Sequence, residues 1–520
     1  MNFMEQLKQE SLKDDYNVAY SENGAKMYRT TGKALLDFSF QVSTLRKASE
    51  KDICSKFTMA FLEDPDYAFK FLFYLRDCFQ GLGERRSFRV ILTHLAKSCA
   101  DNDGNTIIDK ILPLIPEYGR WDDLLCLLDT PCKHKVANII KDQINKDWEH
   151  MNSNKSISLC AKWLPSINTS SGETKRLAKI LIKELHLTEK TYRTTLSALR
   201  KYNNVVETKM SRNQWDQIKY ETVPSKANLI YQEAFLRNDN ERRSAYIQNL
   251  QNSINNANIA LDDININAKA CFPYEIVSKY LLHSGFDAKC KEYNTVLEAM
   301  WLKLMSEMPT LKDIIVVADS SGSMVYNTLN NNTCCLDVAN SFAIACSEKL
   351  QGPYKDKVIT FSSSPKFLDL GNCKTVHDKL EYLSKHSIVD NTDIEKVFSL
   401  ILKTAVNNKV KPEDMPKTIL IISDMGFDAG TKNNNSLFTN IQNNYEQAGY
   451  QVPQLVFLNV ADNGRNNGAI PVVTNNKGAI LMSGFSANIM NMIIQGEMDP
   501  WIVLKKILDS KRYAPITLNK

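Results

Sequence analysis

The chain has 520 residues, of which 43% are hydrophobic and 24% are charged, and its formal net charge is +5. This composition is typical of a folded globular protein and excludes a collagen-like or largely disordered chain. The length predicts about two to four domains. The small net charge excludes nucleic-acid binding through bulk charge, so any such binding needs a local basic patch.

The sequence predicts neither a secretory signal nor a membrane-spanning helix. The N-terminus lacks a basic stretch followed by an apolar run, and no run approaches about 18 apolar residues. The 12 cysteines contain no C-x-x-C pair, and the 7 histidines form no motif along the chain. We therefore expect free thiols, ordinary histidines, and a cytoplasmic protein that does not contact a membrane.

The first part of the chain, residues 1–305, has a helical pattern. Apolar residues recur at spacings of three and four, which is typical of amphipathic helices. Short polar breaks separate these helices, and many short helices joined by turns predict an α-solenoid of stacked, HEAT-like helix pairs. The expected helices are 67–79, 88–100, 106–114, 122–128, 175–185, 192–201, 227–236, 246–254 and 274–283.

The second part, residues 310–520, alternates strand-like and helical patterns. The runs 312–319, 418–424 and 454–460 are apolar almost throughout, as expected for parallel strands that are covered on both faces. Helical patterns lie between and after them. This arrangement predicts a doubly wound α/β domain, in which ligands bind at the carboxyl ends of the strands.

A group of oxygen-bearing side chains follows the first of these strands. Asp319, Ser321 and Ser323 form an Asp-x-Ser-x-Ser pattern there, Asp424 ends the second strand, and Thr392 lies at a helix start. Each piece alone also fits a helix cap or a turn. Together they favour a site for a hard cation, Mg²⁺ or Mn²⁺, because such ions prefer carboxylate and hydroxyl oxygens.

These residues resemble the metal-ion-dependent adhesion site of a von Willebrand factor A domain, and the resemblance covers about residues 310–520. It implies that Ser321, Ser323 and Thr392 contact Mg²⁺, and that Asp319 and Asp424 bind it directly or through water.

Five segments of the first part resemble landmarks of TROVE modules, the helical-repeat rings of the Ro autoantigen and of telomerase- and vault-associated proteins. The order of the two parts is also theirs. Residues 119–123 and 483–486 resemble a TROVE-like family whose domain has no known function. The resemblance implies binding of small structured or misfolded RNAs. The five segments are 21–25, 75–77, 81–85, 118–123 and 161–166.

A cationic ridge offers a candidate RNA-binding surface within the helical part. Lys175, Lys179 and Lys183 are spaced by four residues, so they share one helix face, and Arg176 lies beside them. Such ridges contact phosphate groups. No aromatic residue interleaves the lysines, so we expect readout of shape and charge rather than base stacking. A solvated helix face without a ligand remains the alternative.

The sequence lacks the residue patterns that the enzymatic interpretations require. Ser321 and Ser323 do not lie in a G-x-S-x-G elbow, and the Gly81-x-Gly83 pattern follows a helix, unlike a dinucleotide-binding loop. We therefore expect a non-enzymatic RNA-binding protein. The alternatives are a protein-interaction scaffold, in which the metal binds a carboxylate of a protein partner, and a metal-dependent hydrolase.

Overall fold

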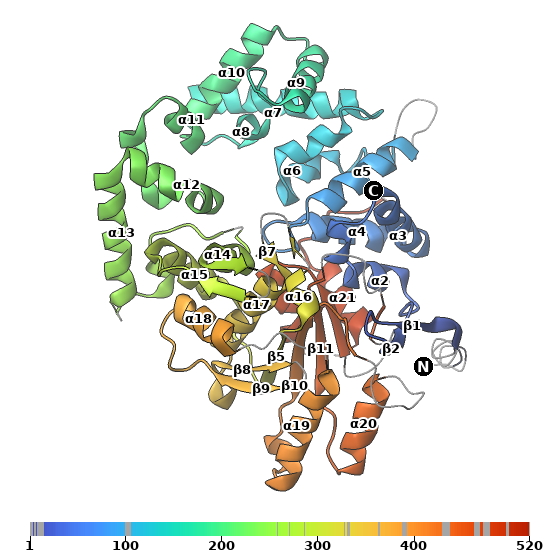
Figure 1. Cartoon of the computed structure of the whole chain (residues 1–520). Coiled ribbons are helices and arrows are strands. Elements are labelled where there is room, and N and C mark those ends of the chain that lie inside the picture. Colours follow the sequence, from blue (N-terminus) through green and yellow to red (C-terminus); the bar gives the residue numbers. More distant parts are fainter. Residues whose placement is uncertain are drawn as a thin grey trace. The chain divides into compact units, whose positions relative to one another are not determined.

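In this computed structural model, a helical region is followed by an α/β region along the chain (Figure 1). The described residues are Met4, Leu7, 15–98, 106–256, 258–269, 271–284, 287–326, 328–329, 333–361, 365–386, 393–428, 437–461, 469–471, 479–495 and 499–518.

The chain divides into two compact units, each of which contains residues from both sides of the expected boundary between residues 305 and 310. One, the α/β unit, combines Met1–Ala68 with Asn249–Arg512, and the other, the helical unit, combines Phe69–Gln248 with Tyr513–Lys520. The N-terminal segment therefore belongs with the sheet, not with the helices that follow it.

Hydrogen bonds explain this arrangement of the N-terminal segment. The buried Ser43 hydroxyl donates to the carbonyl of Asn459 at 3.1 Å and lies 2.8 Å from the Ser483 hydroxyl. The Asn459 side chain donates in turn to the carbonyl of Phe40 at 3.0 Å. Periodicity of apolar residues reports only local structure, so it does not reveal pairings between distant segments.

The helical unit consists mainly of short helices. Figure 1 draws it in blue to green, with α7 to α10 packed against one another. Its helices are the last part of α4 (Pro65–Arg76), α5 (Arg86–Ser98), α6 (Ile115–Tyr118), η4 (Trp121–Leu127), α7 (Lys133–Asn152), α8 (Cys160–Trp163), α9 (Gly172–Glu184), α10 (Glu189–Tyr202), α11 (Val206–Ser211), α12 (Ser225–Asn238) and the first part of α13 (Asn240–Asn255).

Most of the expected helices are confirmed, but three differ in detail, one of them 122–128, which forms the 3₁₀ helix η4. The region 106–114 forms turns and ends in a short 3₁₀ helix, Leu112–Leu114. The helix expected at 274–283 is α14 (Pro273–Tyr280), which stops where strand β3 (Leu281–Ser284) begins. The long helix α7 was missed, because its many charged residues weaken the apolar pattern.

A buried ion-pair network stabilises the helical unit. Asp123 is fully buried, and its carboxylate accepts hydrogen bonds from the side chains of Arg76 and Arg89, both at 2.7 Å. The backbone N–H of Arg120 donates to it at 2.9 Å. Such a carboxylate tolerates burial only when it is paired and hydrogen-bonded, so the motif at residues 119–123 has a structural role here.

The α/β unit contains a six-stranded mixed sheet in the order β12-β11-β10-β5-β8-β9. All neighbouring pairs are parallel except β8 and β9. The six residues of β10 are all buried, as a central strand covered on both faces requires. The strands are β5 (Ile314–Asp319), β8 (Lys357–Phe361), β9 (Lys366–Asp369), β10 (Thr418–Ser423), β11 (Gln454–Asn459) and β12 (Ala479–Ser483).

Helices and short hairpins surround this sheet. Helix α17 packs on β5, β8 and β10 and is buried along most of its length. The helices are α2 (Ala34–Phe40), α3 (Glu50–Glu63), α14, α15 (Thr295–Glu307), α16 (Gly322–Tyr326), α17 (Cys335–Lys349), α18 (Val376–His386), α19 (Ile394–Asn407), α20 (Leu437–Gln447), η10 (Ala487–Gln495) and α21 (Pro500–Leu508); the hairpins pair β1 (Val18–Tyr20) with β2 (Lys26–Tyr28), β3 with β4 (Asp287–Cys290), and β6 (Thr328–Leu329) with β7 (Thr333–Cys334).

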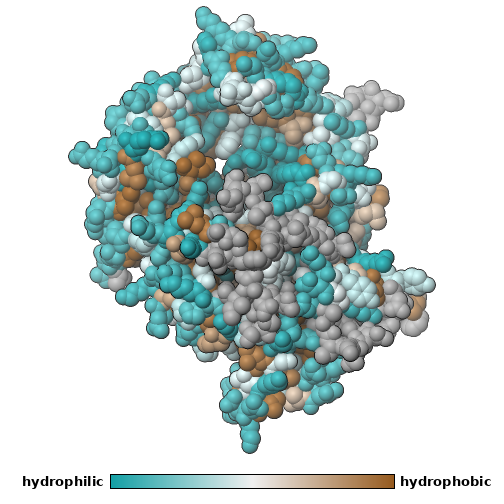
Figure 2. Space-filling model, viewed as in Figure 1, coloured by the Kyte–Doolittle hydropathy of each residue, from teal (hydrophilic) through white to brown (hydrophobic). Residues whose placement is uncertain are grey.

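One face of the molecule is predominantly polar. Figure 2 shows a face on which hydrophilic residues prevail and hydrophobic ones form small separate groups, as is normal for a protein surface in water. Within the described part of the chain, no helix combines the length and the apolar character that crossing a membrane needs.

Glu298 provides a test of the packing of α15. This glutamate is 2% exposed and accepts hydrogen bonds from the backbone N–H of Val376. Burial, reinforced by the nearby Glu348, raises its pKa to about 8. Near neutral pH the folded protein therefore retains this proton, whereas the unfolded chain has already released it.

We expect the wild-type protein to lose stability relative to Glu298→Gln as the pH rises from about 4.5 to about 8. The difference in unfolding free energy between the two proteins changes by at most about 1.4 kcal/mol per pH unit, because the two states of the wild type differ by at most one proton at this position. Glutamine does not titrate, so the variant lacks this dependence. Urea unfolding at several pH values measures the difference. Glu307→Gln, at the exposed end of the same helix, is the matched control, and parallel pH profiles for Glu298→Gln and wild type would contradict the packing described here.

Candidate metal centre and cationic helical face

Asp319 is the last residue of β5 and is fully buried. Its Oδ1 accepts a hydrogen bond from the backbone N–H of Ser321 at 2.8 Å. Its Oδ2 accepts one from the hydroxyl of Ser423 at 2.6 Å. These two bonds fix the orientation of the carboxylate, and each oxygen keeps a further lone pair for a cation.

Of the two serines of the motif, Ser321 directly precedes α16 and Ser323 lies in its first turn. The hydroxyl oxygens of Ser321 and Ser323 lie 3.1 Å apart. Ser321 is 1% exposed, whereas Ser323 is only half-buried. The pair therefore brings two hydroxyl oxygens together, one of them within reach of solvent.

Asp424 follows β10, the strand beside β5. Ile422 of β10 pairs with Ala318 of β5, so Asp424 and Asp319 emerge at the same edge of the sheet. Asp424 is 2% exposed, and its Oδ1 accepts a hydrogen bond from the backbone N–H of Gly426 at 3.0 Å.

Electrostatics link the two carboxylates. Burial, and then the negative charge of Asp424, raise the pKa of Asp319 to about 7. Two carboxylates close together in a dry environment repel each other when both are ionised. A divalent cation would relieve this repulsion, and the surrounding hydroxyl oxygens fit Mg²⁺ or Mn²⁺. The donor set therefore suits the metal that the sequence motif implies.

The backbone after Asp424 is strained. Met425 has a φ of 65°, in the left-handed region that costs a residue with a side chain about 1 kcal/mol or more. Its N–H donates to the Ser423 hydroxyl at 2.9 Å. Such strain persists only where the surrounding structure holds it, and here it shapes the loop that carries Asp424.

The N-terminal segment braces this loop. The side chain of Asn23 donates to the carbonyl of Gly426 at 2.7 Å, and the hydroxyl of Ser21 donates to the carbonyl of Phe427. Gly24 forms an isolated β-bridge with Asp428. The sequence alone assigned residues 21–25 to the helical part, so their contact with the loop that carries Asp424 was missed.

Four of the five predicted metal ligands, Asp319, Ser321, Ser323 and Asp424, thus lie at one edge of the sheet. Thr392 lies outside the described residues. The structure adds Ser423 to this group, because its hydroxyl donates to Asp319 Oδ2.

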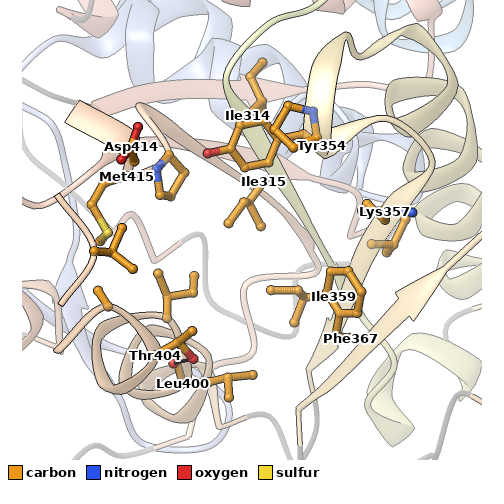
Figure 3. A pocket seen from close by; sticks show the side chains of 16 residues that line it. Ile314, Ile315, Tyr354, Lys357, Ile359, Phe367, Leu400, Thr404, Asp414 and Met415 are labelled. Atoms are coloured by element: carbon orange, nitrogen blue, oxygen red, sulfur yellow. Dashed lines mark hydrogen bonds between the residues drawn. The ribbon is translucent and has the colours of Figure 1, made fainter. Parts of the chain in front are cut away.

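A separate cavity lies at the opposite ends of the same strands (Figure 3). Its volume is about 420 Å³, and it lies between α19 and the first residues of β5 and β8. Ile314, Ile315, Ile359 and Leu400 contribute to a mainly apolar lining. The candidate metal centre lies at the carboxyl ends of the strands, where parallel sheets carry their ligand sites. This cavity lies at the amino ends and is therefore not part of it.

The cationic ridge lies on α9, in the helical unit. Lys175, Lys179 and Lys183 are exposed, and in the part of the chain that the structure describes none of them pairs with an acidic side chain. Arg176 differs, because its guanidinium binds the carboxylates of Asp129 and Glu173. Three of the four predicted RNA-binding residues therefore present uncompensated charge.

Three arginines line a hollow that the sequence alone did not reveal. Arg193, Arg200 and Arg212 surround a cavity of about 240 Å³, and none of its lining residues is acidic. The hydroxyl-bearing residues Ser166, Ser197, Thr208 and Ser211 also line it. Cations and hydroxyls without a carboxylate favour an anion.

The hydrogen bonds of Arg200 explain how this hollow is built. Its guanidinium donates to the carbonyls of Ala161 and Leu164 at 2.8 and 2.7 Å, and to the Ser166 hydroxyl at 2.8 Å. These acceptors are neutral, so the positive charge is fixed but not neutralised. Helical periodicity hides this cluster, because the three arginines lie on different turns of α10 and after α11.

Comparisons with known proteins divide the chain into two matched stretches. Residues 313–503 match the family DUF7788 and residues 132–312 match the family DUF2828, each described as a domain of unknown function. The chain is also similar to "Uncharacterized protein L728" of Acanthamoeba polyphaga mimivirus, at 29% identity over 532 residues, covering 97% of this chain and 89% of the relative.

We expect Asp319→Asn to weaken Mg²⁺ binding by about tenfold or more while the fold survives. The neutral amide also removes the repulsion with Asp424, so the metal-free variant should unfold at a higher temperature than the metal-free wild type. Calorimetry with Mg²⁺ and thermal unfolding in EDTA measure the two effects. Asp414→Asn, at an exposed position near the opposite strand ends, is the control, and unchanged Mg²⁺ affinity in Asp319→Asn would remove the metal centre.

Proposed function

We propose that this protein is a non-enzymatic RNA-binding protein whose helical unit binds the phosphate backbone. The observation that carries the proposal is the concentration of uncompensated positive charge in that unit. Lys175, Lys179 and Lys183 form an exposed row on α9, and the hollow lined by Arg193, Arg200 and Arg212 contains no acidic residue.

The geometry of these cations favours recognition of shape. A row of lysines one helical turn apart follows a line of phosphates, and the arginine hollow, of about 240 Å³, is large enough to hold a phosphate group. Tyr192 lines the hollow, but it is buried and its hydroxyl donates to the carbonyl of Pro165 at 2.8 Å. The ligands we propose are therefore small structured or misfolded RNAs, read by backbone shape rather than by base stacking.

We further propose that the helices form a HEAT-like, TROVE-type module and that the α/β unit is a von Willebrand A-type domain. The residues at 119–123 and the Asp-x-Ser-x-Ser motif support this assignment. We assign Mg²⁺ or Mn²⁺ to Asp319, Ser321, Ser323, Thr392 and Asp424. A cytoplasmic location fits the described cysteines, which are all free thiols.

The metal centre also favours a second function, that of a protein-interaction scaffold. Ser323 is half-buried at the edge of the site, so a metal held there keeps a side open to solvent. A carboxylate of a protein partner would fit that position, since hard cations bind carboxylate oxygens.

Charge reversal on α9 tests RNA binding. We expect the triple variant Lys175→Glu, Lys179→Glu, Lys183→Glu to bind RNA more weakly, and with a log–log salt dependence that is flatter by about one unit per lost phosphate contact. Filter binding of a small hairpin RNA over a salt series gives both quantities. The matched control reverses Lys374, Lys403 and Lys409, which are exposed in the α/β unit.

The outcomes separate the two functions. RNA binding that falls steeply with salt and survives EDTA supports the first, because phosphate contacts release counterions. Parental affinity and slope in the α9 variant would show that this ridge is only a solvated helix face. Capture of an acidic peptide that is lost in EDTA, without RNA binding, would favour the scaffold.

A further inference from the structure

A second group of metal-binding side chains lies in the α/β unit, apart from the Asp319 motif. It consists of His283 on β3, Cys334 at the end of β7, and Asp337 in the first turn of α17. One ligand atom from each lies within 4.8 Å of the others. The three residues come from three elements, so the tertiary fold brings them together.

Two of the three distances within the group are close to those of a coordination sphere. The His283 Nε2 lies 3.0 Å from Asp337 Oδ2 and 4.0 Å from the Cys334 sulfur. Ligand atoms around a tetrahedral zinc ion are separated by roughly 3.3–3.6 Å, given metal–ligand bonds of about 2.0–2.3 Å. Shifts of a few tenths of an ångström would bring both distances to those values.

The start of α17 preorganises two of the three ligands. The backbone N–H of Cys334 donates to Asp337 Oδ2 at 3.0 Å, and the Cys334 side chain accepts from the N–H of Asp337, which completes a capping box. Such reciprocal bonds hold both side chains in place at the helix start. Cys334 and Asp337 are therefore ordered before any ion binds.

One atom of the group lacks a partner. Asp337 is fully buried, and its Oδ1 has no hydrogen bond among the described residues. A buried carboxylate oxygen without a partner costs about 1–3 kcal/mol or more. The capping box and His283 satisfy only the other oxygen, so the structure leaves a place for a positive group beside Oδ1.

We propose that His283, Cys334 and Asp337 bind a zinc ion. A thiolate and an imidazole select Zn²⁺ over Mg²⁺, whereas the all-oxygen donors near Asp319 select the harder ion. Three protein ligands leave the fourth position for water or another ligand. The His283 side chain is 17% exposed, which gives the ion a route from solvent.

Cobalt spectroscopy of the full-length protein tests the site directly. After removal of metals by chelation, Co²⁺ should produce the thiolate-to-cobalt charge-transfer band and the visible bands of a tetrahedral centre, and Zn²⁺ should bleach them. Competition with a chromophoric chelator then gives the Zn²⁺ affinity and a stoichiometry of one. A wild-type protein without the charge-transfer band overturns the proposal, whatever the variants do.

Single substitutions then assign the ligands. Cys334→Ser and His283→Asn should each lower the Zn²⁺ affinity by about tenfold or more, and Cys334→Ser should remove the charge-transfer band. Cys373→Ser is the control, since this thiol is half-buried in the same unit and outside the group. Circular dichroism checks that each variant is folded.

The competing explanation is a capping box with a histidine hydrogen bond and no metal. In that case Cys334→Ser and Cys373→Ser would give the same Zn²⁺ titration as the wild type, which overturns the proposal. The test uses metal alone and no RNA, so its result is independent of the proposed RNA binding.

Discussion

The parallel register of β5 and β10 places two acidic residues at one buried edge of the sheet. Ala318 lies opposite Ile422, and the next residues along the two strands lead to Asp319 and Asp424. A parallel sheet covered on both faces has dry strand ends, where an ionised carboxylate is expensive. The surrounding structure is organised around this constraint.

Three features stabilise the buried carboxylates and the loop at this edge of the sheet. Ser423 and the backbone of Ser321 donate to Asp319, the left-handed conformation of Met425 turns the following loop, and the N-terminal segment holds that loop through Asn23. Two segments that are distant in the chain, residues 21–25 and the loop after Asp424, therefore meet at one site. This dependence also explains why the N-terminal residues belong to the unit that contains the sheet.

The two units differ in which of their charged side chains are paired. In the α/β unit, buried acids accumulate at strand and helix ends, where cations suit them. In the helical unit, the buried acid Asp123 is neutralised by Arg76 and Arg89, while the lysines of α9 and the arginines of the hollow keep their charge available. The chemistry of the two units therefore differs: the acids of the α/β unit suit cations, and the cations of the helical unit suit anions.

Much of the local structure follows from the sequence alone. Apolar runs specify β5, β10 and β11, and three- and four-residue spacing specifies α9 and α10. The motif that contains Asp319, Ser321 and Ser323 spans only five residues, so its side chains stay near one another in any fold. The row of Lys175, Lys179 and Lys183 is likewise a consequence of helical geometry.

Only the tertiary structure decided the remaining features. The brace formed by residues 21–25, the arginine hollow, and the group of His283, Cys334 and Asp337 each join segments that are distant in the chain. No local sequence pattern predicts these long-range contacts, because they depend on which buried faces pack together and on which strands become neighbours. The ion pair between Arg176 and Asp129, which compensates the charge of one predicted RNA-binding residue, likewise joins distant segments.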